Sequence, residues 1–84
     1  MPRLEQLISP LLGPEEAFDA AVFKEKIHHV LNRLLPHYRQ TLLLKYLDNL
    51  SVVDIAKKLS VSIKSAESIL FRARKAFVEL FVSI

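Results

Sequence analysis

The chain has 84 residues, 51% of them hydrophobic, and a formal net charge of +3. This length supports one domain with a single modest core. Cysteine is absent, which excludes disulfides, thiolate zinc sites and cysteine nucleophiles. The N-terminus lacks a signal-peptide pattern, and no segment approaches the roughly 18 consecutive apolar residues of a membrane span. We therefore expect a soluble, cytoplasmic protein that does not enter a membrane.

The positive charge is concentrated in the C-terminal part of the chain. Residues 1–34 carry four Lys or Arg against five acids, whereas residues 35–84 carry eight against four. This imbalance suits an anionic partner, either nucleic acid or a membrane surface. It also suits ordinary helices with solvated charged faces, so charge alone leaves the partner open.

The first part of the chain holds the only glycine and all four prolines. Residues 1–13 are interpreted as a lead-in or linker, and residues 14–84 as one domain. Pro14 occupies a typical first helical position, and the two acids after it favour a helix N-terminus. A helix is therefore expected from residue 14 to about residue 34, before Pro36. Its apolar stripe would be Phe23, Ile27, Val30, Leu31 and Leu34.

Two further helices are expected in the middle of the chain. The first spans residues 36–47 and ends where turn-favouring residues follow. The second spans residues 52–59. Ser51 would be its N-terminal cap, and Asp54 would take the place of the usual Glu in a capping box.

A long helix is expected after the turn at residues 60–62, with Ser62 as its cap. Its apolar residues recur at helical spacing, which indicates one buried stripe. No segment has the pattern of a strand. We predict a small all-α four-helix bundle whose last two helices form a helix-turn-helix. The predicted stripe of the last helix is Ile63, Ala66, Leu70, Ala73, Phe77 and Leu80.

The polar face of this last helix follows from a helical wheel at about 100° per residue. Lys64, Ser68 and Lys75 lie within about 20° of the outward direction. Arg74 lies at the margin of the face. The residues that flank the outward direction within about 80° are Ser65, Glu67, Phe71 and Arg72.

The chemistry of this face suits duplex DNA. Lys64 and Lys75 can neutralise phosphates. Arg72 can do the same, or it can donate two hydrogen bonds to the edge of a guanine. The hydroxyls of Ser62 and Ser65, with the free amides of the helix start, can bind a phosphate. A helix-turn-helix that docks its second helix in the major groove would use these groups together.

Phe71 is the unusual member of the face. A large aromatic side chain left in water costs on the order of 1 kcal/mol relative to burial. Phe71 therefore either contacts a thymine methyl group or packs on the preceding short helix or on a partner protein. The residue pattern leaves these alternatives open.

Several short features of the C-terminal half occur together at characteristic spacing. They include a Leu35-Pro36 start, the run Asp54-Ile55-Ala56 and a closing Arg-Ala-Arg-Lys at residues 72–75. With these features, residues 35–77 resemble region 4 of the sigma-70 family of RNA polymerase sigma factors, most closely the small extracytoplasmic-function type. The pattern Ile-Ala-x-x-Leu alone occurs in many helix-turn-helix families, so the Leu-Pro start and the basic ending carry the specificity.

The resemblance implies recognition of a minus-35 promoter element by the last helix, and docking on the RNA polymerase core for transcription initiation. It also implies a fold of the winged-helix-like or sigma region 4 type, and contacts of Lys45 and Ser62 with backbone phosphates. Lys75 belongs to the same basic face by the helical wheel. The base-reading residues that it implies are Lys64, Ser65, Glu67, Ser68, Phe71 and Arg72.

The chain departs from the family pattern at four positions. Glu67 stands where a basic residue is usual, so it either weakens DNA binding or accepts a hydrogen bond from cytosine N4. Ile69 stands where Arg is frequent and widens either the buried stripe or a stripe that a partner covers. Ser60 replaces the usual turn glycine and must avoid or tolerate a strained backbone, whereas Lys64 replaces a glycine and adds a cation.

Two rival functions belong to other classes. One is a sigma-like module that binds an anti-sigma factor and has weak or lost DNA binding; Glu67 and Ile69 motivate it. The other is the effector domain of a LuxR-type response regulator. No segment resembles the region 2 with which the family melts promoters, so we expect either the C-terminal domain of a longer sigma factor or a small stand-alone relative.

No constellation of residues indicates catalysis. His28 and His29 point to different faces of one helix, and His37 has no evident second ligand, so we expect no metal site. Asp54 is interpreted as a cap and not as an acid catalyst. Without a nucleophile-base pair or a phosphate-binding glycine loop, we expect no enzyme, no catalytic residue and no cofactor.

Overall fold

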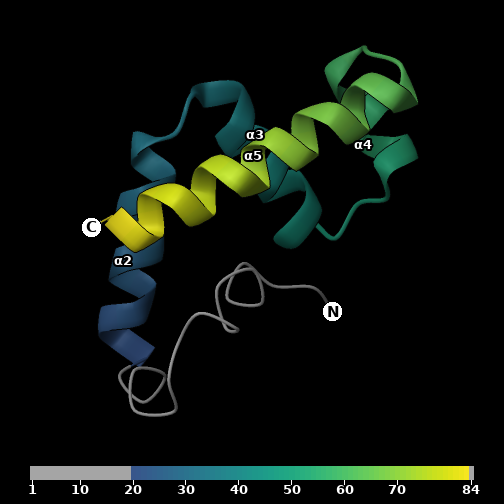
Figure 1. The fold of residues 1–84 in the computed structure, drawn as a ribbon. Coiled ribbons are helices and arrows are strands. Elements are labelled where there is room, and N and C mark those ends of the chain that lie inside the picture. Colours follow the sequence, from purple (N-terminus) through teal and green to yellow (C-terminus); the bar gives the residue numbers. More distant parts are fainter. Residues whose placement is uncertain (1–19, 84) are drawn as a thin grey trace.

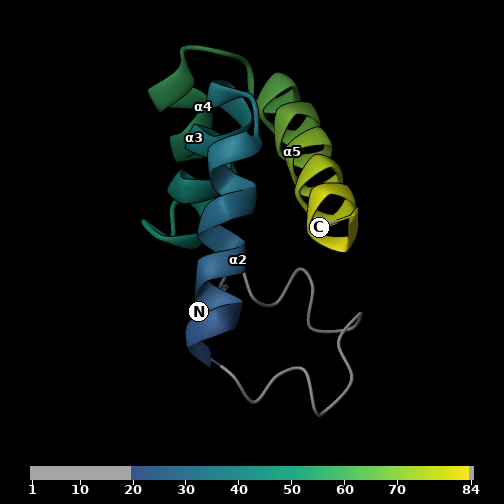
Figure 2. The same cartoon turned by 90° about the vertical axis from the view of Figure 1, so that its left-hand side faces the viewer.

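The computed structural model describes residues 20–83, with side chains described from residue 24 onward. This range contains helices and no strand, which confirms the all-α prediction. In Figure 1, α5 is the long helix that runs across the others, and in Figure 2 it lies on one side with the other three opposite. The predicted lead-in and the predicted helix start at Pro14 lie outside the described residues. The helices are α2 (Ala20–Arg33), α3 (Pro36–Tyr46), α4 (Val52–Leu59) and α5 (Ile63–Ser83).

The main core lies where α2 and α3 pack against α5. The predicted stripe of α2 is confirmed, because Ile27, Val30, Leu31 and Leu34 are all buried; the side chain of Phe23 lies outside the described residues. These residues pack against buried side chains of α5 and against Leu42 of α3, which is fully buried. The other members of the core are Leu42, Leu70, Ala73, Phe77 and Phe81.

The buried stripe of α5 differs from the prediction at its two ends. Ile63 is 47% exposed because it is the first residue of α5, where the core does not cover it. Leu80 is only half-buried, and Phe81 is buried in its place, at 4% exposure. The ring of Phe81 lies under α2, since the Lys26 Nζ is 4.4 Å from its centroid. Contact with α2 therefore decides which residue of the last turn is buried.

A second, smaller core holds the helix-turn-helix together. Ile55 and Ala56 of α4 pack against Ala66 of α5, and all three are buried. Two small alanines at this contact leave room for the helix backbones to approach closely. The half-buried residues around them are Leu44, Leu50, Val52 and Leu59.

The two ends of α4 are closed by local hydrogen bonds. The Asp54 amide donates to the Ser51 Oγ at 3.1 Å, so Ser51 caps α4 as predicted. The reciprocal side-chain half of the capping box is not formed in the described residues, because Asp is one methylene shorter than the usual Glu.

Ser60 follows α4 in the left-handed conformation, with φ 56° and ψ 44°. Its amide donates to the Lys57 carbonyl at 3.2 Å, and the Val61 amide donates to the Ala56 carbonyl at 3.0 Å. This pair of bonds is the Schellman motif, which normally places glycine at the left-handed position. Of the two outcomes expected for Ser60, the structure shows that serine tolerates the strained backbone of the turn.

Candidate nucleic-acid interface

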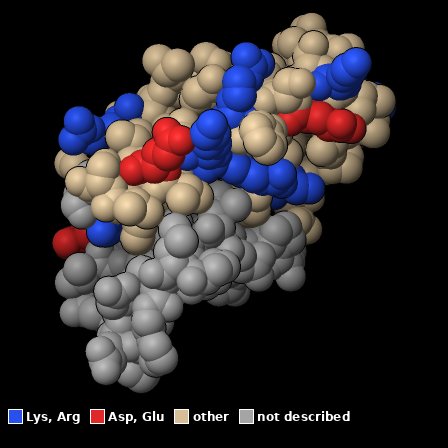
Figure 3. All heavy atoms as spheres, viewed as in Figure 1, with Lys and Arg blue, Asp and Glu red and all other residues tan. Residues whose placement is uncertain are grey.

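The exposed face of α5 gathers seven of the nine residues predicted to bind DNA. Its residues belong to neither hydrophobic core. Figure 3 views the molecule from the side of α5 and shows Lys and Arg atoms along this surface with acidic atoms among them. The seven residues, all exposed, are Lys64, Ser65, Glu67, Ser68, Phe71, Arg72 and Lys75.

The start of α5 is organised by Ser62, the eighth predicted residue. The Ser65 amide donates to the Ser62 Oγ at 3.0 Å, which confirms the predicted cap. The Ser62 hydroxyl in turn donates to the Ser65 Oγ at 3.0 Å. This arrangement leaves the Ser65 hydroxyl proton available to a ligand. The amides of Ile63 and Lys64 precede any intrahelical acceptor, so they also remain available.

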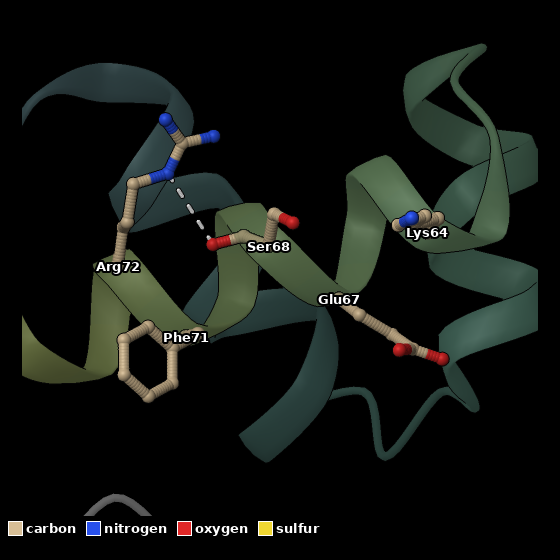
Figure 4. Close-up of a pocket in the computed structure, with 5 residues that line it drawn as sticks. All are labelled: Lys64, Glu67, Ser68, Phe71 and Arg72. Atoms are coloured by element: carbon tan, nitrogen blue, oxygen red, sulfur yellow. Dashed lines mark hydrogen bonds between the residues drawn. The ribbon is translucent and has the colours of Figure 1, made fainter.

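A shallow hollow lies on the exposed face of α5. Figure 4 shows that the side chains around it spread to both edges of the helix: Arg72 points to one edge, whereas Glu67 and Phe71 point to the other. The Arg72 Nε donates to the Ser68 carbonyl at 3.3 Å, which leaves the two terminal nitrogens of the guanidinium for a ligand. The residues that line the hollow are Lys64, Glu67, Ser68, Phe71 and Arg72.

Phe71 is 67% exposed and belongs to neither hydrophobic core. The alternative that it packs on the preceding short helix is therefore wrong, because α4 packs on Ala66, on the opposite side of α5. Ile69 is half-buried and widens the apolar side of α5, as expected. The remaining explanations for Phe71 are contact with DNA or with a partner protein.

Arg74 is removed from the exposed face by a contact that the sequence did not reveal. Its Nε donates to the Tyr46 hydroxyl at 2.6 Å, and its Cζ lies 5.7 Å from the Tyr46 ring centroid. Tyr46 is 28 positions earlier in the chain, so no local spacing signals the pair. Lys45, the ninth predicted residue, precedes Tyr46 in the last turn of α3 and is half-buried. The structure places Lys45 on α3, apart from the seven residues on α5 and from Ser62, which caps α5.

The described residues offer little to other ligand classes. Within residues 20–83, no three acidic or histidine side chains converge in a way that could hold a metal ion. His28 and His29 are exposed on α2, and His37 lies with its ring centroid 4.4 Å from that of Tyr38. Among α2 to α5, no helix combines the length and apolar character that crossing a membrane requires.

Comparison with known proteins identifies the family. The family model described as Sigma-70, region 4 matches residues 24–77, which include the helix-turn-helix and the hollow on α5. No curated protein and no solved structure matches the chain significantly. The match covers more than half of the chain and agrees with its all-α architecture. The chain therefore belongs to the sigma-70 region 4 family, a family of DNA-binding helix-turn-helix domains and not a class of enzymes.

Proposed function

We propose that this chain acts in the cytoplasm by recognising a minus-35-like promoter element with α5 and bringing the RNA polymerase core to it. The observation that carries the proposal is the shared exposed face of α5, where Lys64 and Arg72 line a shallow hollow and Lys75 is exposed further along the helix. In a helix-turn-helix, this second helix is the one that enters the major groove. The domain that performs this role is proposed to span residues 14–84.

The roles of the individual residues follow from their chemistry. Lys64 and Lys75 neutralise phosphates, and the terminal nitrogens of Arg72 contact a guanine edge or a phosphate. The start of α5, capped by Ser62, supplies amides and a hydroxyl to a further phosphate. Lys45, on the neighbouring helix, contacts the backbone beside the groove. These contacts orient α5 so that its centre meets the bases.

Docking on RNA polymerase requires a surface apart from the DNA face. Apolar side chains remain exposed at both ends of α3, where Leu35 is 56% and Leu47 is 70% exposed. Single exposed apolar side chains are common on soluble proteins, so the polymerase-binding part of the proposal rests on the family match, and these two residues are the positions at which to test it.

A second candidate function is binding of an anti-sigma factor with weak DNA binding. Two features of the α5 face favour it: Phe71 is largely exposed, and Glu67 brings a negative charge to a surface that would meet phosphates. The two functions differ in the strength and salt dependence of DNA binding.

Fluorescence anisotropy of the 84-residue protein with promoter-like duplexes tests the proposal. Binding should weaken as salt rises from about 50 to 200 mM, because phosphate contacts release counterions. Combining Lys64→Ala with Lys75→Ala should lower the magnitude of the salt slope by about 2. Combining Lys24→Ala with Arg33→Ala removes the same charge from exposed positions on α2 and should leave the slope nearly unchanged. Absence of binding near 50 mM salt would reject DNA recognition and favour the anti-sigma function.

A further inference from the structure

Glu67 and Phe71 form a distinct edge of the hollow on α5. They are four residues apart, so their side chains are neighbours on the helix surface. Figure 4 shows both pointing to the same edge, opposite to Arg72. Glu67 is exposed and makes no hydrogen bond or ion pair in the described part of the chain, even though Lys64 lies one turn before it. The hollow thus presents an unneutralised carboxylate next to an exposed aromatic ring.

A carboxylate on this face distinguishes among the four bases. A phosphate repels it, whereas a base edge with a hydrogen-bond donor attracts it. In the major groove, guanine and thymine present hydrogen-bond acceptors, which repel a carboxylate. Adenine presents the N6 amino donor, but the N7 acceptor lies beside it. Cytosine presents its N4 amino group without a competing acceptor, so Glu67 favours cytosine.

Phe71 selects by a different property of the base. An aromatic ring gains most from an apolar contact, and the thymine methyl group is the apolar feature of the major groove. Four helical residues rise about 6 Å, and successive bases on one strand are about 3.4 Å apart. Glu67 and Phe71 can therefore reach neighbouring bases, or bases separated by one position.

We propose that Glu67 and Phe71 together select a cytosine and a thymine on one strand of the duplex. The inference rests on the proposed function, in which α5 faces DNA. Both side chains lie on one edge of α5, so they approach the same strand, while Arg72 on the other edge approaches the opposite strand. On the strand that faces this edge of α5, the pair therefore determines where a cytosine and where a thymine is required.

The test begins with selection of duplexes from a randomised pool by the wild-type protein, followed by anisotropy with single-base variants. Replacing the selected cytosine by another base should weaken binding about 10-fold. Glu67→Gln should move the preference at that position from cytosine to adenine, because an amide pairs with adenine N6 and N7. Glu79→Gln changes the charge equally at an exposed α5 position outside the hollow and should leave the preferred base unchanged.

The thymine contact has its own test. Replacing the selected thymine by deoxyuridine removes only the methyl group, which should weaken wild-type binding a few-fold and leave Phe71→Ala unaffected. Duplex binding without a cytosine preference, or an unchanged preference in Glu67→Gln, overturns the inference and leaves the proposed function standing. If the wild-type protein binds no duplex at all, both the inference and the proposed function are overturned.

Discussion

Arg74 in the middle of α5 is bonded to Tyr46 at the end of α3 through an Nε to hydroxyl hydrogen bond of 2.6 Å. The bond joins two helices across 28 positions of sequence and is partly buried. It fixes α5 against the turn of α3 that carries Lys45, and therefore fixes the distance between Lys45 and the face of α5. Arg74, a cation in a basic motif, thus acts as a positioning residue through its Nε, which holds α5 against α3.

Tyr46→Phe tests this link, because it removes the acceptor of Arg74 and keeps the ring. We expect the free energy of unfolding to fall by about 1.5 kcal/mol, the lower end for a charged hydrogen bond, because the site is only partly buried. Urea denaturation followed by circular dichroism measures the change. Tyr38→Phe is the matched control, since Tyr38 is also half-buried in α3 and its hydroxyl has no hydrogen bond in the described residues. Equal losses in both variants would contradict the assignment.

Substitution by alanine should affect stability strongly at one phenylalanine of α5 and hardly at all at another. Phe77 is fully buried in the main core, so Phe77→Ala should lower the free energy of unfolding by about 3–5 kcal/mol. Phe71 is 67% exposed, so Phe71→Ala should change it by no more than about 0.5 kcal/mol. Thermal or urea unfolding of the two variants gives the comparison. A large loss for Phe71→Ala would place that ring in a core and remove it from the interface.

The fold followed from sequence wherever the signal was local. Ser51 and Ser62 were predicted as caps, and the predicted bounds of α4 agree with the structure because hydroxyl caps and turn residues act within a few positions. Periodicity failed at the ends of α5. Ile63 and Phe81 are 18 positions apart, about five full turns, so a helical wheel gives them the same direction. One is exposed and the other buried, because only the tertiary contact with α2 distinguishes them.

For the candidate site too, local features were predicted from the sequence and tertiary contacts were not. The wheel predicted the exposed face of α5 because exposure on a helix is set by direction relative to the apolar stripe. It placed Arg74 at the margin from direction alone and could not predict the hydrogen bond with Tyr46, which depends on how α3 is placed. The spacing of Phe77 and Phe81 is also helical, so periodicity admits Phe81 as well as Leu80, and only the contact with α2 decides between them.

Ser60→Gly should stabilise the protein. Ser60 holds a left-handed conformation with φ 56°, which is costly for a residue with a Cβ atom and not for glycine. Relief of this strain is partly offset by the greater entropy of glycine in the unfolded chain, so we expect the free energy of unfolding to rise by about 0.5–1 kcal/mol. Ser68→Gly, at an exposed position inside α5, should instead destabilise by about 0.5 kcal/mol. Urea midpoints with equal slopes would measure both changes, and a loss of stability in Ser60→Gly would contradict the strain.

Ser62 allows the cap of α5 to be separated from its predicted phosphate contact. Ser62→Ala should lower the free energy of unfolding by about 1 kcal/mol, because the Ser65 amide loses its acceptor. Ser62→Asp should restore the cap and the stability, yet weaken duplex binding because a carboxylate then faces a phosphate. Ser51→Ala removes the cap of α4 and serves as the control for stability alone. Unweakened duplex binding by Ser62→Asp would place Ser62 away from the DNA backbone.

The position of Phe81 matters for anyone who shortens or fuses this domain. The family match ends at residue 77, but the main core continues one helical turn further, to a ring that is 4% exposed and lies against Lys26 of α2. A fragment cut at the family boundary would keep every predicted DNA-contacting residue and still lose part of the packing that anchors α2. For this chain, the boundary of the recognisable family pattern and the boundary of the folding unit are different.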